Sequence, residues 1–166
     1  MEEILNQHRQ EFDEIRRLCL QCHGLDLTSS NIFSGSTYET PSDRTKSVLH
    51  SMLSSSLLNL AVSIRVNLYQ GTIKNKLIPL KTMAADIYDD EELIIKEVTI
   101  KDVCDKIIHA DSVSKPIIPE VLLEHDVKIS FQLKGINRKK AWTLNLCLEN
   151  FTESVLILLD EIESNG

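Results

Sequence analysis

Side chains that could perform acid–base chemistry occur together in the segment 99–110. Its apolar residues recur at positions 100, 103, 104, 107 and 108, which predicts a helix with one buried face. Asp102, Asp105 and His109 lie outside that apolar face. Asp105 and His109 are four residues apart, so on a helix the carboxylate can reach and orient the imidazole. The alternative is a helix with an acidic start and a terminal His, which the helix dipole favours without any catalysis.

A second pair of reactive side chains, Arg44 and His50, has the spacing R-x5-H. A guanidinium can hold a phosphate while an imidazole takes the proton of a ribose 2′-hydroxyl, so the pair is a candidate for RNA cleavage. On an ideal helix, however, the two side chains point about 120° apart. A solvated helix start is therefore the alternative interpretation.

The segment Cys19–His23 matches the C-x-x-C-H pattern of covalent haem attachment. Haem attachment requires export, and the acidic start of the chain does not resemble a secretory signal. Zinc would require a fourth ligand, which no second C-x-x-C or H-x-x-x-H supplies. We therefore expect neither a cofactor nor a metal, and free thiols in a cytoplasmic protein.

The composition indicates a soluble globular chain, with 42% hydrophobic and 26% charged residues. Its 166 residues fit a single domain, 1–166. The net charge of −7 disfavours wide tracking along a nucleic acid. A local RNA site remains open because residues 137–140, Asn-Arg-Lys-Lys, form a compact basic cluster. No apolar run reaches the roughly 18 residues of a membrane span, so no membrane partner is expected.

The periodicity predicts a mainly α fold, a bundle of about four helices with an inserted antiparallel β-hairpin at 125–148. The expected helices cover 2–24 with Gly24 as C-cap, Ser42 or Asp43 to Gly71, 99–110, and a last one starting at Asn150 or Thr152. A loop is expected at 25–41, and short extended pieces at 77–80 and 93–98. The hairpin strands are 127–133 and 142–148, with a polar turn at 135–140. Their alternation directs Phe131, Leu133, Trp142 and Leu144 to one core.

The sequence Val-Cys-Asp-Lys-Ile-Ile-His-Ala at 103–110 resembles the Cys-Asn-Lys-Ile-Ile-His-Ala helix of small bacterial proteins that are similar to the HEPN superfamily. The resemblance covers mainly 44–69 and 99–110. It implies a helical domain of the kind found in RNases of toxin–antitoxin, abortive-infection and CRISPR systems. In that superfamily an Arg-x4–6-His motif at a dimer interface cleaves RNA without metal. A homodimer that buries part of 44–69 is therefore expected.

The chain departs from the superfamily motif at Asp105, where the family has Asn, and at Lys101, where Arg is expected. Three interpretations follow: an inactive relative, a site assembled across helices from His109 and Arg65, or no kinship. If the protein cleaves RNA, the candidate catalytic residues are His109 as base, Asp105 as orienting group, and Arg65 or Arg44 as phosphate ligand, with His50 as the weaker base. The competing hypothesis is a non-catalytic accessory subunit, antitoxin or immunity factor whose acidic surface binds a protein.

Overall fold

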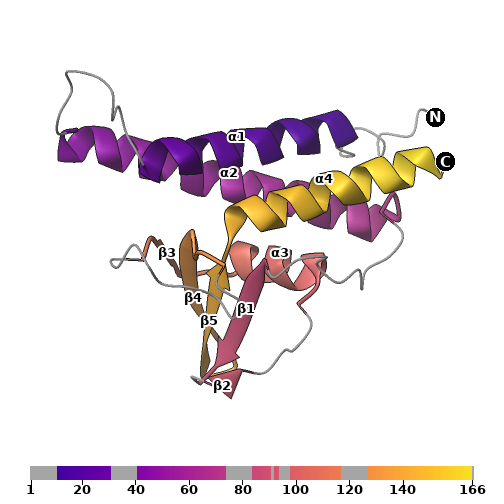
Figure 1. Ribbon diagram of the computed structural model, residues 1–166. Helices are drawn as coiled ribbons and strands as arrows, with labels where there is room; N and C mark the ends of the chain where they lie inside the picture. The colour runs from indigo at the N-terminus through magenta and orange to yellow at the C-terminus, as the bar shows by residue number, and fades with distance from the viewer. Residues whose placement is uncertain are drawn as a thin grey trace, which may run out of the picture.

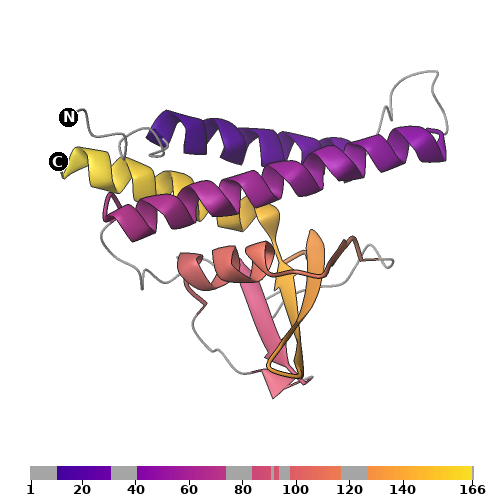
Figure 2. The ribbon, with the colours of Figure 1, turned by 180° about the vertical axis from the view of Figure 1, so that it is seen from behind.

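The computed structural model describes residues 11–30, 41–73, 84–90, 92–93, 98–116 and 127–165. The elements in chain order are α1 (Phe12–Ser30), α2 (Asp43–Gln70), β1 (Ala85–Asp89), β2 (Glu92–Leu93), α3 (Ile100–Ile108), β3 (Ser112–Ser114), β4 (Phe131–Asn137), β5 (Lys140–Leu146) and α4 (Leu148–Ser164). The three long helices α1, α2 and α4 form one layer, and the sheet extends away from it (Figure 1). Seen from behind, α3 lies beneath α2 and in front of the sheet (Figure 2). The predicted mainly α fold with a smaller antiparallel part is confirmed.

The sheet is larger than the predicted hairpin. Its strand order is β2-β1-β5-β4-β3, and every neighbouring pair is antiparallel. The hairpin itself is β4–β5, but its strands continue through the segment expected as a turn, so that Asn137 pairs with Lys140. Only Arg138 and Lys139 remain in the turn. The expected extended piece at 77–80 lies outside the described residues.

One face of the sheet carries the core beneath the helices. In the register of β4 with β5, Phe131 is opposite Leu146, Leu133 is opposite Leu144, and Gly135 is opposite Trp142. These side chains alternate with exposed or half-buried neighbours, because successive residues of a strand point to opposite faces. The prediction that Phe131, Leu133, Trp142 and Leu144 share one core is confirmed, since all four are buried in the same cluster.

Helix α2 begins and ends where the sequence predicts. The Ser42 hydroxyl accepts a hydrogen bond from the Thr45 backbone N–H, and Gly71 ends the helix in the left-handed conformation at φ 77°. Ten of its residues are buried, so α2 is the central helix of the core. By length and composition it could also cross a membrane, a test that buried core helices pass as well.

Two helix boundaries differ from the prediction. Gly24 does not end α1, because the helix continues to Ser30. Helix α4 starts at Leu148, earlier than the predicted Asn150 or Thr152, with Cys147 as its N-cap residue. In both places an apolar residue continues the buried side of the helix, and this packing outweighs the local signal of Gly or of a polar cap.

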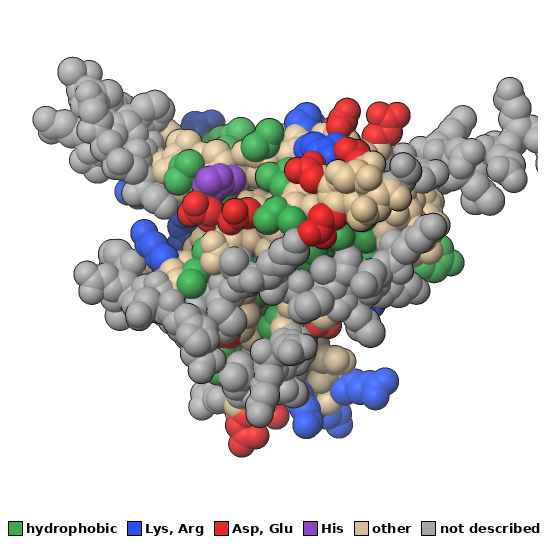
Figure 3. All heavy atoms as spheres, turned by 45° about the vertical axis from the view of Figure 1, so that its right-hand side comes forward, with side chains coloured by type: hydrophobic (Ala, Val, Ile, Leu, Met, Phe, Trp, Pro, Cys, Tyr) green, Lys and Arg blue, Asp and Glu red, His purple; other side chains and the backbone are tan. Residues whose placement is uncertain are grey.

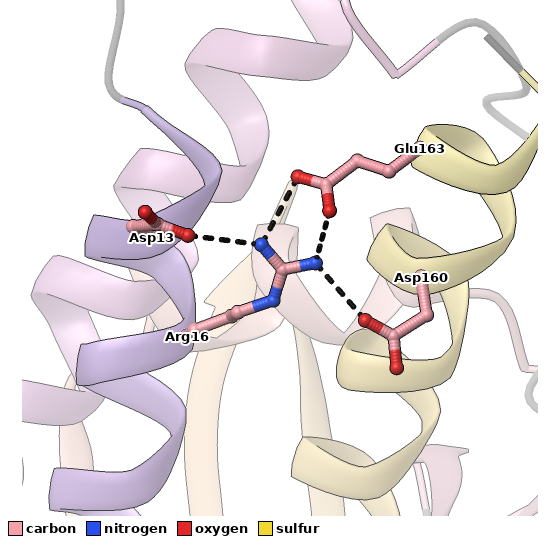
Figure 4. Close-up of polar contacts among 4 residues, drawn as sticks. All are labelled: Asp13, Arg16, Asp160 and Glu163. Atoms are coloured by element: carbon pink, nitrogen blue, oxygen red, sulfur yellow. Dashed lines mark hydrogen bonds and ion pairs between the residues drawn. The ribbon is translucent and has the colours of Figure 1, made fainter.

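Arg16 joins the first and last helices. Its guanidinium donates hydrogen bonds to Asp13 of α1 and to Asp160 and Glu163 of α4, at 2.6 to 3.0 Å (Figure 4). Three carboxylates therefore share one cation, which leaves this end of the helical layer acidic. The same carboxylates raise the pKa of Arg16, most of all through the hydrogen bonds that Glu163 accepts from it.

Candidate functional site

Helix α3 is fixed at its start by a capping box. The Thr99 hydroxyl accepts from the Asp102 backbone N–H at 3.1 Å, and the Asp102 carboxylate accepts from the Thr99 backbone N–H at 2.9 Å. The Thr99 hydroxyl also donates to that carboxylate. The Asp102 carboxylate is therefore engaged in capping the start of the helix.

Arg65 reaches across from α2 to α3. Its Nε lies 2.6 Å from Oδ1 of Asp105, and Nζ of Lys101 lies 2.6 Å from Oδ2 of the same carboxylate. The three side chains are about one third exposed. Of the predicted site residues, the structure thus brings Arg65 and Asp105 into direct contact, and it adds Lys101, whose position in the sequence was noted only as a departure from the family pattern.

His109 is the C-cap residue of α3, and its backbone N–H donates to the Asp105 carbonyl at 3.1 Å. The side chain is exposed. Its imidazole has no hydrogen bond or ion pair with any residue of the described chain. Asp105 was expected to contact the imidazole, but its two carboxylate oxygens instead form ion pairs with Arg65 and Lys101.

Lys101, Asp105 and His109 recur every four residues, so they advance by only about 40° each around the helix and share one side of α3. Cβ atoms four residues apart lie about 5–6 Å from each other. The Arg65 guanidinium at Asp105 is consequently about one helical turn from the imidazole. We refer to Arg65, Lys101, Asp105 and His109 as the α2/α3 site.

Arg44 and His50 belong to another part of α2. Both are exposed, and Arg44 lines a hollow of about 410 Å³ together with Leu25, Val48 and Met52. Along the helix Arg44 is separated from Arg65 by roughly 30 Å, at 1.5 Å per residue. Within one chain, Arg44 and His50 are not part of the α2/α3 site.

The β4–β5 hairpin supports the C-terminal end of α3. Nζ of Lys106 lies 4.3 Å from the ring centre of Trp142, in a cation–π contact. A methyl group added to Gly135 would lie 2.3 Å from Cζ2 of Trp142 and 3.0 Å from the carbonyl oxygen of His109. The Asp111 backbone N–H donates to the Lys134 carbonyl at 2.8 Å. The position of His109 therefore depends on how closely α3 packs on this hairpin.

The cysteines are buried and free. Burial is the main cause that raises the pKa of Cys19 and of Cys22 to about 12, so both thiols stay protonated. Within the described ranges, no three His, Cys, Asp or Glu side chains gather closely enough to hold a metal ion. The C-x-x-C-H segment lies inside α1, with Cys19 and Cys22 in the core.

A further polar cluster lies where α1 meets the start of α4, and sequence reasoning missed it. Nζ of Lys115 lies 3.0 Å from Oδ1 of the buried Asp26, and 5.2 Å from the ring centre of Phe131. Asp26 and Lys115 border a cavity of about 540 Å³ that His23 and Cys147 also line. Asp26 and Lys115 are 89 residues apart, so no local spacing could have paired them.

A comparison of the chain with protein-family models, curated proteins and solved structures gives no match.

Proposed function

We propose that this chain is a HEPN-like RNase that cleaves RNA without a metal ion at the α2/α3 site. The observation that carries the proposal is the Arg65–Asp105 contact, which places a guanidinium from α2 about one helical turn from the exposed His109 of α3. This is the arrangement expected for an Arg and His pair assembled across two helices rather than along one. It supports His109 and Arg65 over Arg44 and His50 as the reacting pair.

The chemistry needs a proton acceptor and a positive charge beside the phosphate. His109 takes the proton of the ribose 2′-hydroxyl, whose oxygen then attacks the adjacent phosphorus. Arg65 and Lys101 stabilise the charge that develops on the phosphate oxygens. The bond from phosphorus to the 5′ oxygen breaks, and that oxygen takes a proton from water. The products are a 2′,3′-cyclic phosphate and a 5′-hydroxyl end.

The test is cleavage of a mixed-sequence RNA in the presence of a chelator. We expect His109→Ala and Arg65→Ala each to lower the rate by at least about 100-fold, the scale of general-base and electrostatic contributions. His50→Ala and Arg44→Ala are matched controls on the distant part of α2 and should cleave as the unmodified protein does. Cleavage by His109→Ala at the full rate, or products with a 3′-hydroxyl, would contradict the proposal.

A role in bacterial defence or in a toxin–antitoxin pair is part of the same proposal, and it derives from the resemblance of 103–110 to HEPN-like helices. An RNase of this kind should slow the growth of a host that expresses it. Growth inhibition by the unmodified chain that His109→Ala abolishes would support the role. Equal inhibition by both would contradict it.

A homodimer is supported by the apolar side chains that α2 leaves in solvent. Val48, Met52, Val62 and Tyr69 are 40% to 86% exposed and lie within one arc of the helix. Light scattering should give twice the monomer mass. Met52→Glu with Val62→Glu should give a monomer, whereas a monomer already present in the unmodified protein at high concentration would contradict the dimer.

The second candidate function is a non-catalytic protein that binds a basic partner. It is favoured by the acidic end of the helical layer, where Asp13, Asp160 and Glu163 surround Arg16 (Figure 4). An accessory subunit, antitoxin or immunity factor would use this surface. This function would be favoured over the first by two results together. The unmodified protein would cleave no RNA, and a partner that co-purifies with it would be lost in the variant Asp160→Lys with Glu163→Lys.

A further inference from the structure

The β4–β5 region has a charge opposite to that of the whole protein. Residues 127–148 contain five cations and no Asp or Glu, although the chain has a net charge of −7. The five are Lys128, Lys134, Arg138, Lys139 and Lys140. Lys and Arg side chains gather at the end of the sheet that is remote from the long helices, beside a smaller acidic group (Figure 3).

The cations of the hairpin are available to a ligand. Arg138, Lys139 and Lys140 are exposed, and none of their side chains has a hydrogen bond or ion pair in the described part of the chain. Elsewhere the cations of Arg16, Arg17 and Lys115 are bound to carboxylates, and Arg65 and Lys101 share the single negative charge of Asp105. The hairpin thus differs from these sites in presenting positive charge that the protein does not neutralise.

The turn is held in a conformation that its residues do not favour. Arg138 and Lys139 adopt positive φ angles of 48° and 70°, and they are the two central residues of a two-residue turn. Such turns favour Asn-Gly, because side chains other than Asn, Asp or Gly are strained there. Strained exposed residues are concentrated at functional sites. The basic residues therefore suggest a use beyond closing the hairpin.

The hairpin leads to the α2/α3 site. The backbone of Gly135 is packed against the carbonyl of His109, and Arg138 follows three residues later, about 10 Å along the strand. A hollow of about 610 Å³ adjoins Gly135, and Lys134, Trp142, Asp90 and Asp111 are among the residues that line it. An extended nucleic acid strand could therefore contact His109 and the turn at once.

We propose that the β4–β5 turn binds the phosphates of single-stranded RNA a few nucleotides from the bond at His109. This inference rests on the proposed function for its choice of RNA over an acidic protein. Arg is suited to phosphate because its planar guanidinium can donate two parallel hydrogen bonds. Asp90 and Asp111 line the hollow itself and repel phosphate. The proposed RNA strand therefore follows the edge of the hollow on the side of Arg138 and Lys139.

The test measures binding of a fluorescent single-stranded RNA to the His109→Ala protein at several salt concentrations. Arg138→Glu with Lys139→Glu should weaken binding by about tenfold or more and lower the salt slope by about 1.4, the value for two lost contacts to a single strand. Arg44→Glu with Lys46→Glu is the matched control, since it reverses two cations at the start of α2 that have no ion pair with the residues that the structure describes. The control should change the slope far less.

Arg138→Asn with Lys139→Gly removes the same charges but has the residues that this turn favours. Weaker RNA binding by this variant would therefore be caused by the lost cations and not by a misfolded hairpin. An equal loss in the hairpin variants and the α2 control would overturn the proposal, as would a chain that binds no RNA. The proposal would also be overturned if the hairpin substitutions abolished binding of polyglutamate but left the affinity for RNA unchanged.

The two proposals fail differently. Hairpin-dependent binding by a chain that cleaves nothing would contradict the RNase and leave the RNA contact in place. Cleavage of long RNA that is insensitive to the hairpin substitutions would contradict the contact and leave the RNase. A dinucleotide is too short to reach the turn, so the hairpin variants should cleave it at the unmodified rate.

Discussion

Arg65 Nε lies 2.6 Å from Asp105 Oδ1, which links the central helix α2 to the short helix α3. Lys101 holds the other oxygen of the same carboxylate. Asp105 therefore serves to position two cations beside His109 rather than to orient the imidazole. In the proposed RNase, the role of Asp105 changes from a partner of the base to a support for the two cations.

The Arg65–Asp105 contact should contribute modestly to stability. Because both side chains are about one third exposed, a double-mutant cycle of Arg65→Ala and Asp105→Asn should give a coupling energy of about 0.5–1 kcal/mol. Urea unfolding of the four proteins measures it. A coupling of several kcal/mol would mean that the pair is a main support of the fold.

Trp142 should be a major contributor to stability, because it is 4% exposed in the core between the sheet and α3. We expect Trp142→Ala to lower the free energy of unfolding by about 3–5 kcal/mol. Leu20→Ala is the matched control, since Leu20 is 65% exposed on α1, and it should change stability by less than about 0.5 kcal/mol. Chemical denaturation that gives similar values for both variants would contradict the packing described here.

Two glycines should respond to alanine in opposite directions. Gly135→Ala places a methyl group 2.3 Å from Trp142 Cζ2, and the overpacking should lower stability by about 1–3 kcal/mol. Gly24 is exposed within α1, with no atom within 4 Å of the added methyl, so Gly24→Ala should raise stability by up to about 1 kcal/mol. Thermal unfolding of both variants measures the difference in sign. A stabilising Gly135→Ala would show that the hairpin does not constrain α3.

The β4–β5 turn should be more stable with a different sequence. Arg138→Asn with Lys139→Gly removes the strain of two positive φ angles and should raise the free energy of unfolding by about 1–2 kcal/mol. The same variant should bind RNA less tightly, because it lacks both turn cations. Denaturant titration measures the free energy of unfolding of both proteins. A lower value for the variant would contradict the inference that the turn is strained.

The buried thiols predict a loss of stability at alkaline pH. The pKa of Cys19 and of Cys22 is raised to about 12 in the folded protein, against about 8.5 in the unfolded chain. The unfolded thiols therefore lose their protons first, and the stability that is fully present below pH 8.5 falls as the pH rises toward 12. Each thiol contributes a slope of at most about 1.4 kcal/mol per pH unit. Urea unfolding between pH 7.5 and 10.5 should show a smaller slope for Cys19→Ala with Cys22→Ala, and equal slopes would contradict the prediction.

Local signals in the sequence determined the features that depend on neighbouring residues. The Ser42 cap and Gly71 set the two ends of α2, and the periodicity of 99–110 predicts α3 because a helical face must be apolar to be buried. The alternation around Trp142 predicts the hairpin and its core face, since side chains of a strand alternate between faces. The basic segment 137–140 was also evident, as charge is read directly from composition.

The tertiary structure decided what depends on residues distant in the chain. No spacing rule connects Arg65 to Asp105, 40 positions later, because the contact arises only when α3 packs beneath α2. The hairpin became part of a five-stranded sheet because β1 and β3 pair with its two edges, and short strands carry little periodic signal. Helix α1 continues past Gly24, where the local preference alone predicted an end, because Leu25 packs against the core and Asp26 pairs with the distant Lys115. The sequence thus specifies the elements, whereas the packing between them determines which charges surround His109.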